Sequence, residues 1–196
     1  MSGAGTGRTR TVLDGIGNTP LVQVDGIWAK LEYLNPSGSI KARIAKYMIE
    51  RAEREGRLRP GDTIVEASSG NTGNAMSMVA AVKGYRMLVV MPKGMSHERL
   101  AISRAFGAEV LMVGDFHVTQ ALETARELGT RPGHFAPQQF DNEWNVDENR
   151  ESLGAETLAQ LPAGVVPDAV IAGVGTGGTL IGVGQAFRAA NPRCAV

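Results

Sequence analysis

Lys41 is the first residue whose type and position could do chemistry. It lies in NPSGSIKARIAKYMIERAEREG (residues 35–56), where no proline or glycine interrupts residues 40–55. A helix is predicted there, with Ser37 or Ser39 as its N-cap. At about 100° per residue, its polar face consists of Arg43, Lys46, Glu50, Glu53 and Arg54, and its apolar face of Ile44, Ala45, Met48 and Ala52. Lys41 lies within the apolar face. It either reaches past the helix end into water, or loses hydration and becomes a less basic, more reactive amine.

A turn rich in small polar residues, SSGNTG (residues 68–73), follows the predicted strand TIVEA. Its side chains that could bind a ligand are Ser68, Ser69, Asn71 and Thr72. Hydroxyl, amide and backbone N–H groups at a helix N-terminus bind anions, and several short hydrogen bonds suit a carboxylate. Capping alone needs only one such side chain, so the turn favours a binding site over a simple cap.

A second turn, GVGTGG (residues 173–178), lies between a predicted strand and a helix. Successive backbone N–H groups and two hydroxyls come from Gly175, Thr176, Gly177, Gly178 and Thr179. Such a turn binds phosphate. It is not a P-loop, because no Lys-Ser or Lys-Thr follows. Gly173, Gly175 and Gly178 form a GxGxxG pattern, which keeps a dinucleotide site open. The acidic residue expected about 20 positions later would fall beyond Val196.

These three features together match the needs of pyridoxal phosphate (PLP) acting on an amino acid. A desolvated lysine can hold the cofactor's aldehyde as a Schiff base, one turn can hold its phosphate and the other the substrate carboxylate. A dinucleotide-binding oxidoreductase would explain the GVGTGG turn, but neither Lys41 nor the SSGNTG turn.

The elements that must position these groups alternate between strand and helix. Strands are predicted at residues 21–24, 27–33, 63–67, 86–91, 109–114 and 169–174. Helices are predicted near residues 40–56, 71–83, 97–106, 118–128, 143–160 and 179–190. This alternation predicts an α/β fold with a mainly parallel, twisted sheet covered by helices on both faces.

Composition excludes several classes of function. The 20 basic and 20 acidic side chains balance and form no basic block, so neither nucleic acid nor membrane is an expected partner. No run of 18 apolar residues occurs, and residues 1–11 are predicted to be a disordered tail rather than a signal peptide. The single cysteine, Cys194, cannot form an intrachain disulfide, which suits a cytoplasmic protein.

The other ionisable groups give no further site. His97, His117 and His134 lack the spacing of metal ligands, so no metal is expected. The acidic side chains of the predicted helix at 143–160 and the residues before it are expected to face solvent; they are Asp141, Glu143, Asp147, Glu148 and Glu151.

Five motifs in order give the chain a specific resemblance. They are IGNTPLV (residues 16–22), NPSGSIKAR (35–43), SSGNTGNAM (68–76), MPKGMSHERLAISRAFGAE (91–109) and GVGTGGTLIGVG (173–184). From about residue 12 onward the sequence resembles the cysteine synthase and cystathionine β-synthase family of fold type II PLP enzymes, which have a tryptophan synthase β-like fold. The resemblance implies that the C-terminal third of the family pattern is lacking.

The resemblance also implies roles and domains. Lys41 would form the Schiff base, Asn71 would bond the cofactor's ring hydroxyl, and residues 175–179 would bind its phosphate. The substrate carboxylate would be bound by Ser68, Ser69, Asn71, Thr72 and Gln139. Two interleaved three-layer αβα domains are expected: residues 12–34 with 142–196 form part of a larger PLP-binding domain, and residues 35–141 form a smaller mobile domain.

Some positions depart from the family pattern. Ala42 follows the lysine where aspartate is usual, which removes a carboxylate beside the site. Ser68 replaces a commoner threonine and keeps the hydroxyl. DNEWNVDENRESLGAE (residues 141–156) replaces the usual NPxNPxxHxxTGPE but keeps Asn142, Asn145, Gly154 and Glu156. These departures leave the donor and acceptor substrates open.

The function that the resemblance implies is β-replacement on O-acetylserine or O-phosphoserine, with sulfide giving L-cysteine through an aminoacrylate. Cystathionine or diaminopropionate synthesis would use the same residues, and a truncated, non-catalytic remnant of the fold is a further alternative. A homodimer is expected, with serine acetyltransferase as a possible partner.

Overall fold

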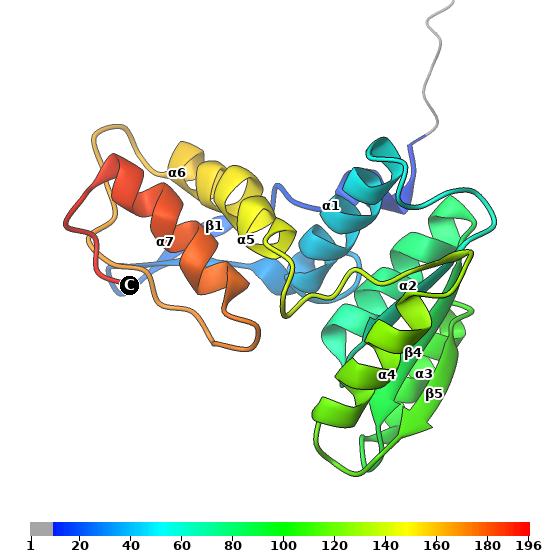
Figure 1. Cartoon of the computed structure of the whole chain (residues 1–196). Helices are drawn as coiled ribbons and strands as arrows, with labels where there is room; N and C mark the ends of the chain where they lie inside the picture. The colour runs from blue at the N-terminus through cyan, green and yellow to red at the C-terminus, as the bar shows by residue number, and fades with distance from the viewer. Residues whose placement is uncertain (1–9) are drawn as a thin grey trace, which may run out of the picture.

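A computed structural model describes residues 10–196 and divides them into two lobes (Figure 1). The sheet lobe holds β3–β6 with helices α2, α3 and α4. The helical lobe holds α5, α6, α7 and the hairpin β1–β2. Helix α1 (Lys41–Arg54) lies between the lobes and packs against both α2 and α5. Of the predicted disordered tail, residues 1–9 lie outside the described part, and Thr11 caps a short 3-10 helix, η1 (Val12–Gly15).

The four-stranded sheet is parallel throughout. Its order is β5 (Glu109–Val113), β4 (Arg86–Pro92), β3 (Thr63–Ala67) and β6 (His134–Phe135). β1 (Leu21–Val24) and β2 (Ile27–Lys30) form a separate antiparallel hairpin, and the 3-10 helix η2 (Glu32–Leu34) follows it. The predicted α/β class with a parallel sheet is confirmed.

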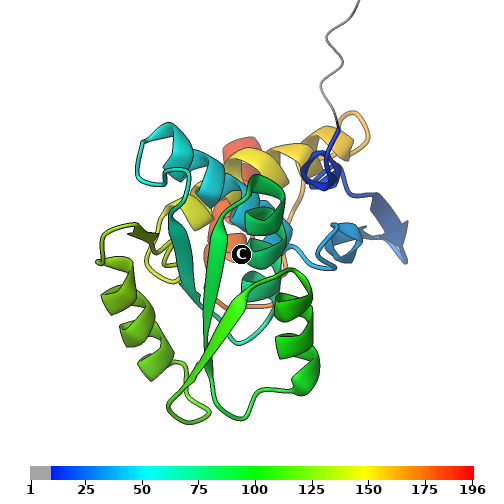
Figure 2. The ribbon, with the colours of Figure 1, turned by 90° about the vertical axis from the view of Figure 1, so that its right-hand side faces the viewer.

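Helices cover both faces of this sheet, as Figure 2 shows. α4 (Thr119–Gly129) packs on one face, while α2 (Asn71–Lys83) and α3 (His97–Ala105) pack on the other. Side chains alternate along a strand, so Val65 faces α4 and Ile64 faces α2. A parallel sheet needs this cover, because both of its faces are apolar.

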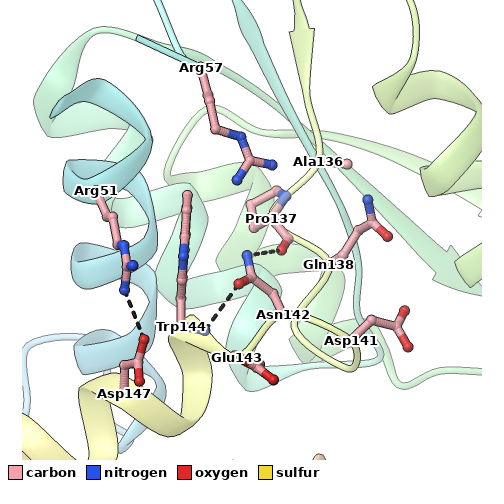
Figure 3. Close-up of a pocket in the computed structure, with 10 residues that line it drawn as sticks. All are labelled: Arg51, Arg57, Ala136, Pro137, Gln138, Asp141, Asn142, Glu143, Trp144 and Asp147. Atoms are coloured by element: carbon pink, nitrogen blue, oxygen red, sulfur yellow. Dashed lines mark hydrogen bonds and ion pairs between the residues drawn. The ribbon is translucent and has the colours of Figure 1, made fainter. Parts of the chain in front are cut away.

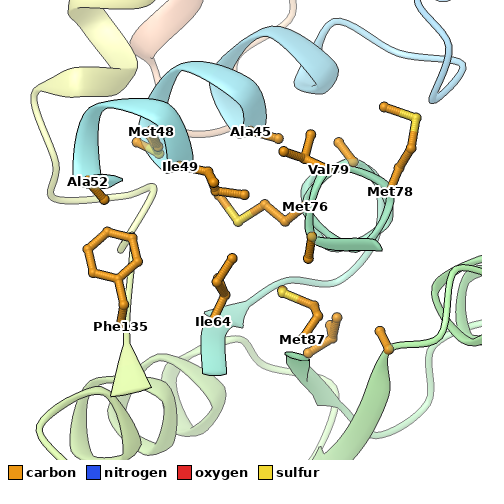
Figure 4. Packing of buried hydrophobic residues seen from close by; sticks show 14 of the residues in the cluster. Ala45, Met48, Ile49, Ala52, Ile64, Met76, Met78, Val79, Met87 and Phe135 are labelled. Atoms are coloured by element: carbon orange, nitrogen blue, oxygen red, sulfur yellow. The ribbon is translucent and has the colours of Figure 1, made fainter. Parts of the chain in front are cut away.

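The main core joins α1 to the sheet lobe (Figure 4). Met48 and Ile49 of α1 are fully buried among Met76 of α2, Ile64 of β3 and neighbouring side chains. Each buried side chain of this size contributes about 1.5–3 kcal/mol through the hydrophobic effect. The packing therefore holds the first residue of α1, Lys41, in a defined position beside the sheet.

The helical lobe is built on tight glycine contacts. α5 (Trp144–Glu148), a π-helical segment η3 (Asn149–Gly154) and α6 (Ala155–Gln160) run on from one another over the predicted helix at 143–160. α7 (Gly178–Ala190) lies against them, and a Cβ added at Gly182 would lie 2.5 Å from the carbonyl oxygen of Val146. Glycine in α7 thus permits the close approach of the two helices.

Two sequence predictions about a strand and a cap were wrong, and one strand was missed. No strand forms at 169–174, where Ala169 makes only an isolated bridge with Ala195 and Ile171 is 94% exposed. A strand needs a neighbouring backbone, and within residues 10–196 only Ala195 pairs with this segment. β6 was not predicted, because two residues are too short for a pattern. The N-cap of α1 is Ile40, although Ser39 Oγ accepts a hydrogen bond from the Lys41 N–H at 3.3 Å.

No helix among residues 10–196 combines the length and the apolar character needed to cross a bilayer.

Candidate active site

One cavity brings together most of the residues predicted from the sequence. Its volume is about 320 Å³, which is within the usual range for small-molecule sites. The predicted residues that line it are Lys41, Ser68, Ser69, Asn71, Thr72, Gln139, Gly175 and Thr176. It lies at the carboxyl end of β3, where ligands bind in open parallel sheets. The cavity lining does not include the next three predicted residues of the chain, Gly177, Gly178 and Thr179.

Lys41 is the first residue of α1 and is partly buried at the cavity. Burial lowers the pKa of its amine, and the negative charge of Glu148 opposes this change. A less basic amine is deprotonated more often near neutral pH and is then nucleophilic. Lys41 therefore has the character that a covalent attachment to an aldehyde requires.

The SSGNTG turn is held in shape by its own hydrogen bonds. Ser68 Oγ accepts the N–H groups of Gly70 and Gly73, at 3.1 and 2.9 Å, so it organises the start of α2. The hydroxyl of Thr72 donates to Gln139 Oε1 at 2.6 Å, and Gln139 Nε2 donates to the carbonyl oxygen of Ala67 at 3.0 Å. The turn and the segment that carries Gln139 are thereby joined before any ligand binds.

Ser69 and Asn71 are the members of the turn whose side chains stay available. Both are exposed at the cavity, and neither side chain hydrogen-bonds to another described residue. The guanidinium of Arg99 donates to the carbonyl oxygen of Ser69 at 3.0 Å and lines the same cavity. Sequence reasoning missed Arg99, which comes from α3 and has no local motif that links it to the SSGNTG turn.

Glu66 in β3 was also missed, although a glutamate within the apolar strand TIVEA is an available signal. It is 1% exposed, and its Oε2 accepts the N–H of Gln139 at 3.2 Å. Backbone N–H groups of Ala67 and Gln138 also donate to this carboxyl. Gln138 has a φ of 56°, a left-handed conformation that is uncommon outside glycine. Glu66 therefore fastens the Gln138–Gln139 segment to the end of β3.

We expect Glu66→Gln to flatten the pH dependence of stability. Burial raises the pKa of Glu66 from 4.5 to about 8, against the opposing effect of its backbone hydrogen bonds. Between these two pH values the folded state keeps a proton that the unfolded state has lost. Stability from this group is therefore present at low pH and falls as the pH rises toward 8. Glutamine keeps an acceptor oxygen and does not ionise.

Urea unfolding from pH 5 to 9 measures this effect. Glu127→Gln, at a side chain that is 76% exposed, is the matched control and should keep the slope of the unaltered protein. An unchanged slope in Glu66→Gln would mean that this carboxyl does not hold the proton.

The GVGTGG turn lines the cavity with Gly175 and Thr176 and leads into the N-terminus of α7. Gly177 is the N-cap with a φ of 86°, a conformation that glycine adopts without strain. A Cβ at Gly178 would collide with Asn145 Oδ1, so only glycine fits there. Asn145 Nδ2 donates to Thr176 Oγ1 at 2.8 Å and to the carbonyl oxygen of Gln139 at 2.9 Å. Asn145 thus ties the GVGTGG turn to the segment that carries Gln139, a role that no local pattern revealed.

An ion-pair network around Arg43 lies next to the site. It buries one residue of the predicted polar face of α1. Arg43 belongs to the predicted polar face but is 3% exposed, and its guanidinium pairs with Glu32 at 2.7 Å and Glu156 at 2.9 Å. Burial alone would raise the pKa of Glu156, but hydrogen bonds from Arg43 and Lys30 lower it to about 2. These bonds tie α1 to the hairpin region and α6.

The prediction that the acidic side of the helix at 143–160 faces solvent is wrong for Glu148. Asp141, Glu143 and Glu151 are exposed, but Glu148 is 2% exposed. The helix lies between α1 and α7, so a side that reads as polar in the sequence is covered by α1.

A larger depression of about 390 Å³ lies away from Lys41 and contains none of the predicted site residues (Figure 3). Its wall is a stack in which the Trp144 ring lies 4.9 Å from the Arg51 guanidinium and 4.8 Å from that of Arg57. Arg51 also pairs with Asp147 at 2.8 Å. Trp144 is 7% exposed and packs in the main core.

No group of three or more histidine, cysteine or acidic side chains within residues 10–196 is arranged to hold a metal ion.

Comparison with known proteins agrees with this geometry. The family described as pyridoxal-phosphate dependent enzyme matches residues 12–196. A cysteine synthase of Staphylococcus aureus (strain N315) is 46% identical over 186 residues, which cover 90% of this chain and 60% of the relative. O-ureido-L-serine synthase of Streptomyces lavendulae is 42% identical over 194 residues, which cover 95% and 60%. The resemblance inferred from the motifs is confirmed.

Solved structures show the same fold. The crystal structure of O-ureido-L-serine synthase superimposes with a TM-score of 0.88 at 40% identity, covering 96% of this chain and 62–63% of the other. A hydrogen sulfide-producing enzyme of Fusobacterium nucleatum superimposes with a TM-score of 0.87 at 39% identity, covering 95% and 65%. The chain spans about 60% of the length of the curated relatives it matches. The predicted fold type II architecture is confirmed.

Proposed function

Because the chain belongs to the family of pyridoxal-phosphate dependent enzymes, we propose that it catalyses β-replacement on an O-activated L-serine. The donor is O-acetylserine or O-phosphoserine, the nucleophile is sulfide, and the product is L-cysteine. The relatives named cysteine synthase support this choice. The observation that carries it is that Lys41, Ser69 and Thr176, from three distant segments, line one cavity.

The residues present fit PLP. The cavity is lined by the Lys41 amine, by the SSGNTG turn that we propose for the substrate carboxylate, and by Gly175 and Thr176 of the turn that we propose for the phosphate. Only glycine fits at position 178 of that turn. When bound, PLP supplies a pyridine ring that serves as an electron sink. Lys41 would bond its aldehyde carbon, Asn71 its ring hydroxyl, and residues 175–179 its phosphate.

The remaining residues act on the substrate. Ser68, Ser69, Asn71, Thr72 and Gln139 surround the place proposed for its carboxylate. Once released from the cofactor, the Lys41 amine takes the α-proton as general base, and the leaving group departs from the β-carbon.

The proposal extends to the whole protein. Residues 35–141 form the smaller, mobile domain, and residues 12–34 with 142–196 form part of the larger one. The protein works as a cytoplasmic homodimer, and serine acetyltransferase is a candidate partner.

The direct test is addition of PLP, followed by sulfide with each donor. We expect a visible absorbance band after PLP addition and L-cysteine among the products, identified by mass spectrometry. A yellow protein that makes cystathionine from homocysteine, but no cysteine, would favour the related β-replacement. A protein that does not bind PLP would be the non-catalytic remnant.

We expect Ser69→Ala to bind PLP normally but to need much more donor. Hydrogen bonds to a charged group contribute about 1.5–3 kcal/mol each, so the loss of one weakens donor binding by roughly 10- to 150-fold. A donor titration followed by the visible spectrum measures the midpoint. Ser96→Ala, at an exposed serine outside the cavity, is the control. An unchanged midpoint in Ser69→Ala would mean that the turn is only a helix cap.

A further inference from the structure

Glu148 is a buried carboxyl whose second oxygen has no partner. It is 2% exposed at the end of α5, and Oε2 makes no hydrogen bond. The hydroxyl of Ser152 donates to this carboxyl, and Ser152 Oγ in turn accepts the Arg43 guanidinium at 3.2 Å. Burial of an unpartnered carboxyl oxygen is costly, so the charged groups around it decide whether it is tolerated.

The charged groups around Glu148 come from three neighbouring elements. They are Lys41 and Arg43 of α1, Glu32 of η2 and Glu156 of α6. Arg43 is already committed, because its nitrogens hydrogen-bond to Glu32, Glu156, Ser152 and Thr19. Lys41 is the remaining cation of this group, and its amine makes no hydrogen bond or ion pair within residues 10–196.

Lys41 has no carboxylate beside it on its own helix. The next residue, Ala42, is completely buried and carries no charge. Glu148 is the carboxyl that acts on the Lys41 amine, and it reaches α1 from the helix packed against it. We propose that Glu148 is a positioning residue that serves as the counter-ion of Lys41 whenever that amine is free and protonated.

This inference rests on the proposed role of Lys41. As general base, Lys41 gains a positive charge in a partly desolvated place each time it takes the α-proton. A carboxylate nearby stabilises that ammonium and keeps it pointing toward the cavity. Burial raises the pKa of Glu148 to about 7, so its charge changes near neutral pH, where the amine must be released and recaptured.

The test is the pH dependence of PLP attachment in Glu148→Gln. Without the carboxylate, the Lys41 amine should be harder to protonate. The pH midpoint for attachment, followed by visible absorbance after mixing with PLP, should therefore move down by about 1 unit or more. Glu148→Asp keeps the charge and should restore most of the midpoint. Glu151→Gln, at an exposed carboxylate of the same helical run, is the matched control. Equal midpoints in Glu148→Gln and the unaltered protein would overturn the proposal.

A second measurement needs no PLP and no folded variant at position 148. Reductive methylation with ¹³C-formaldehyde labels the lysines, and Lys41→Arg identifies the Lys41 signal by its absence. In the unaltered protein this signal should titrate in two steps, one of them near pH 7. A single step would overturn the role of Glu148. Failure of PLP to attach to the unaltered protein would instead contradict the proposed function, and the lysine titration would still decide the role of Glu148.

Discussion

Lys41→Ala abolishes covalent attachment of PLP and lowers β-replacement activity by at least about a thousandfold. The amine is both the group that holds the cofactor and the proposed general base, and loss of a positioned base alone costs about 10²- to 10⁴-fold. No other lysine lines the cavity. Borohydride reduction, proteolysis and mass spectrometry locate the attachment, which we expect on the peptide that carries Lys41.

Lys46→Ala is the control for this experiment. Lys46 lies on the same helix, but its amine donates to the carbonyl oxygen of Leu13 at 3.0 Å and is not part of the cavity. This variant should bind PLP as the unaltered protein does. Cofactor found on a lysine other than Lys41 would contradict the assignment.

Gly177→Val weakens PLP binding by about 100-fold. Residue 177 has a φ of 86°, so a β-branched residue would force the turn out of its conformation. The backbone N–H groups that follow would no longer converge on the phosphate. Loss of two charge-assisted hydrogen bonds at about 1.5 kcal/mol each corresponds to roughly this factor. Titration with PLP, followed by absorbance, measures the affinity.

Gly173→Val is the matched control within the same turn. It has no positive φ, and an added Cβ would meet nothing within 4 Å. It should bind PLP normally if the phosphate lies at residues 175–179. Equal weakening in both variants would favour the GxGxxG interpretation, in which Gly173 approaches a dinucleotide. Helical circular dichroism of each variant shows whether α7 is still formed.

The parts of the site that could be predicted are those that depend on near neighbours. A turn such as SSGNTG carries its hydroxyls, its glycines and its helix start within six residues, so the prediction that it binds an anion needs only the local sequence. The same holds for the GVGTGG turn at the start of α7. Likewise, the position of Lys41 follows from the 3.6-residue period of α1. The roles of these residues toward PLP and substrate stay predictions.

Tertiary contacts decided the rest, because they join residues far apart in the chain. Arg43 and Glu148 both lie in stretches that read as polar. Arg43 is buried by its contacts with η2, η3 and α6, and Glu148 is buried where α5 packs on α1. Asn145 and Glu66 connect segments that the sequence separates widely. The segment 169–174 has the pattern of a strand, yet within residues 10–196 it pairs only with Ala195. By itself, the sequence determined the α/β class and the places of the helices and of the two glycine-rich turns, since these follow from local spacing. Which charges are buried together, and which strands pair, depended on long-range packing that no local spacing contains.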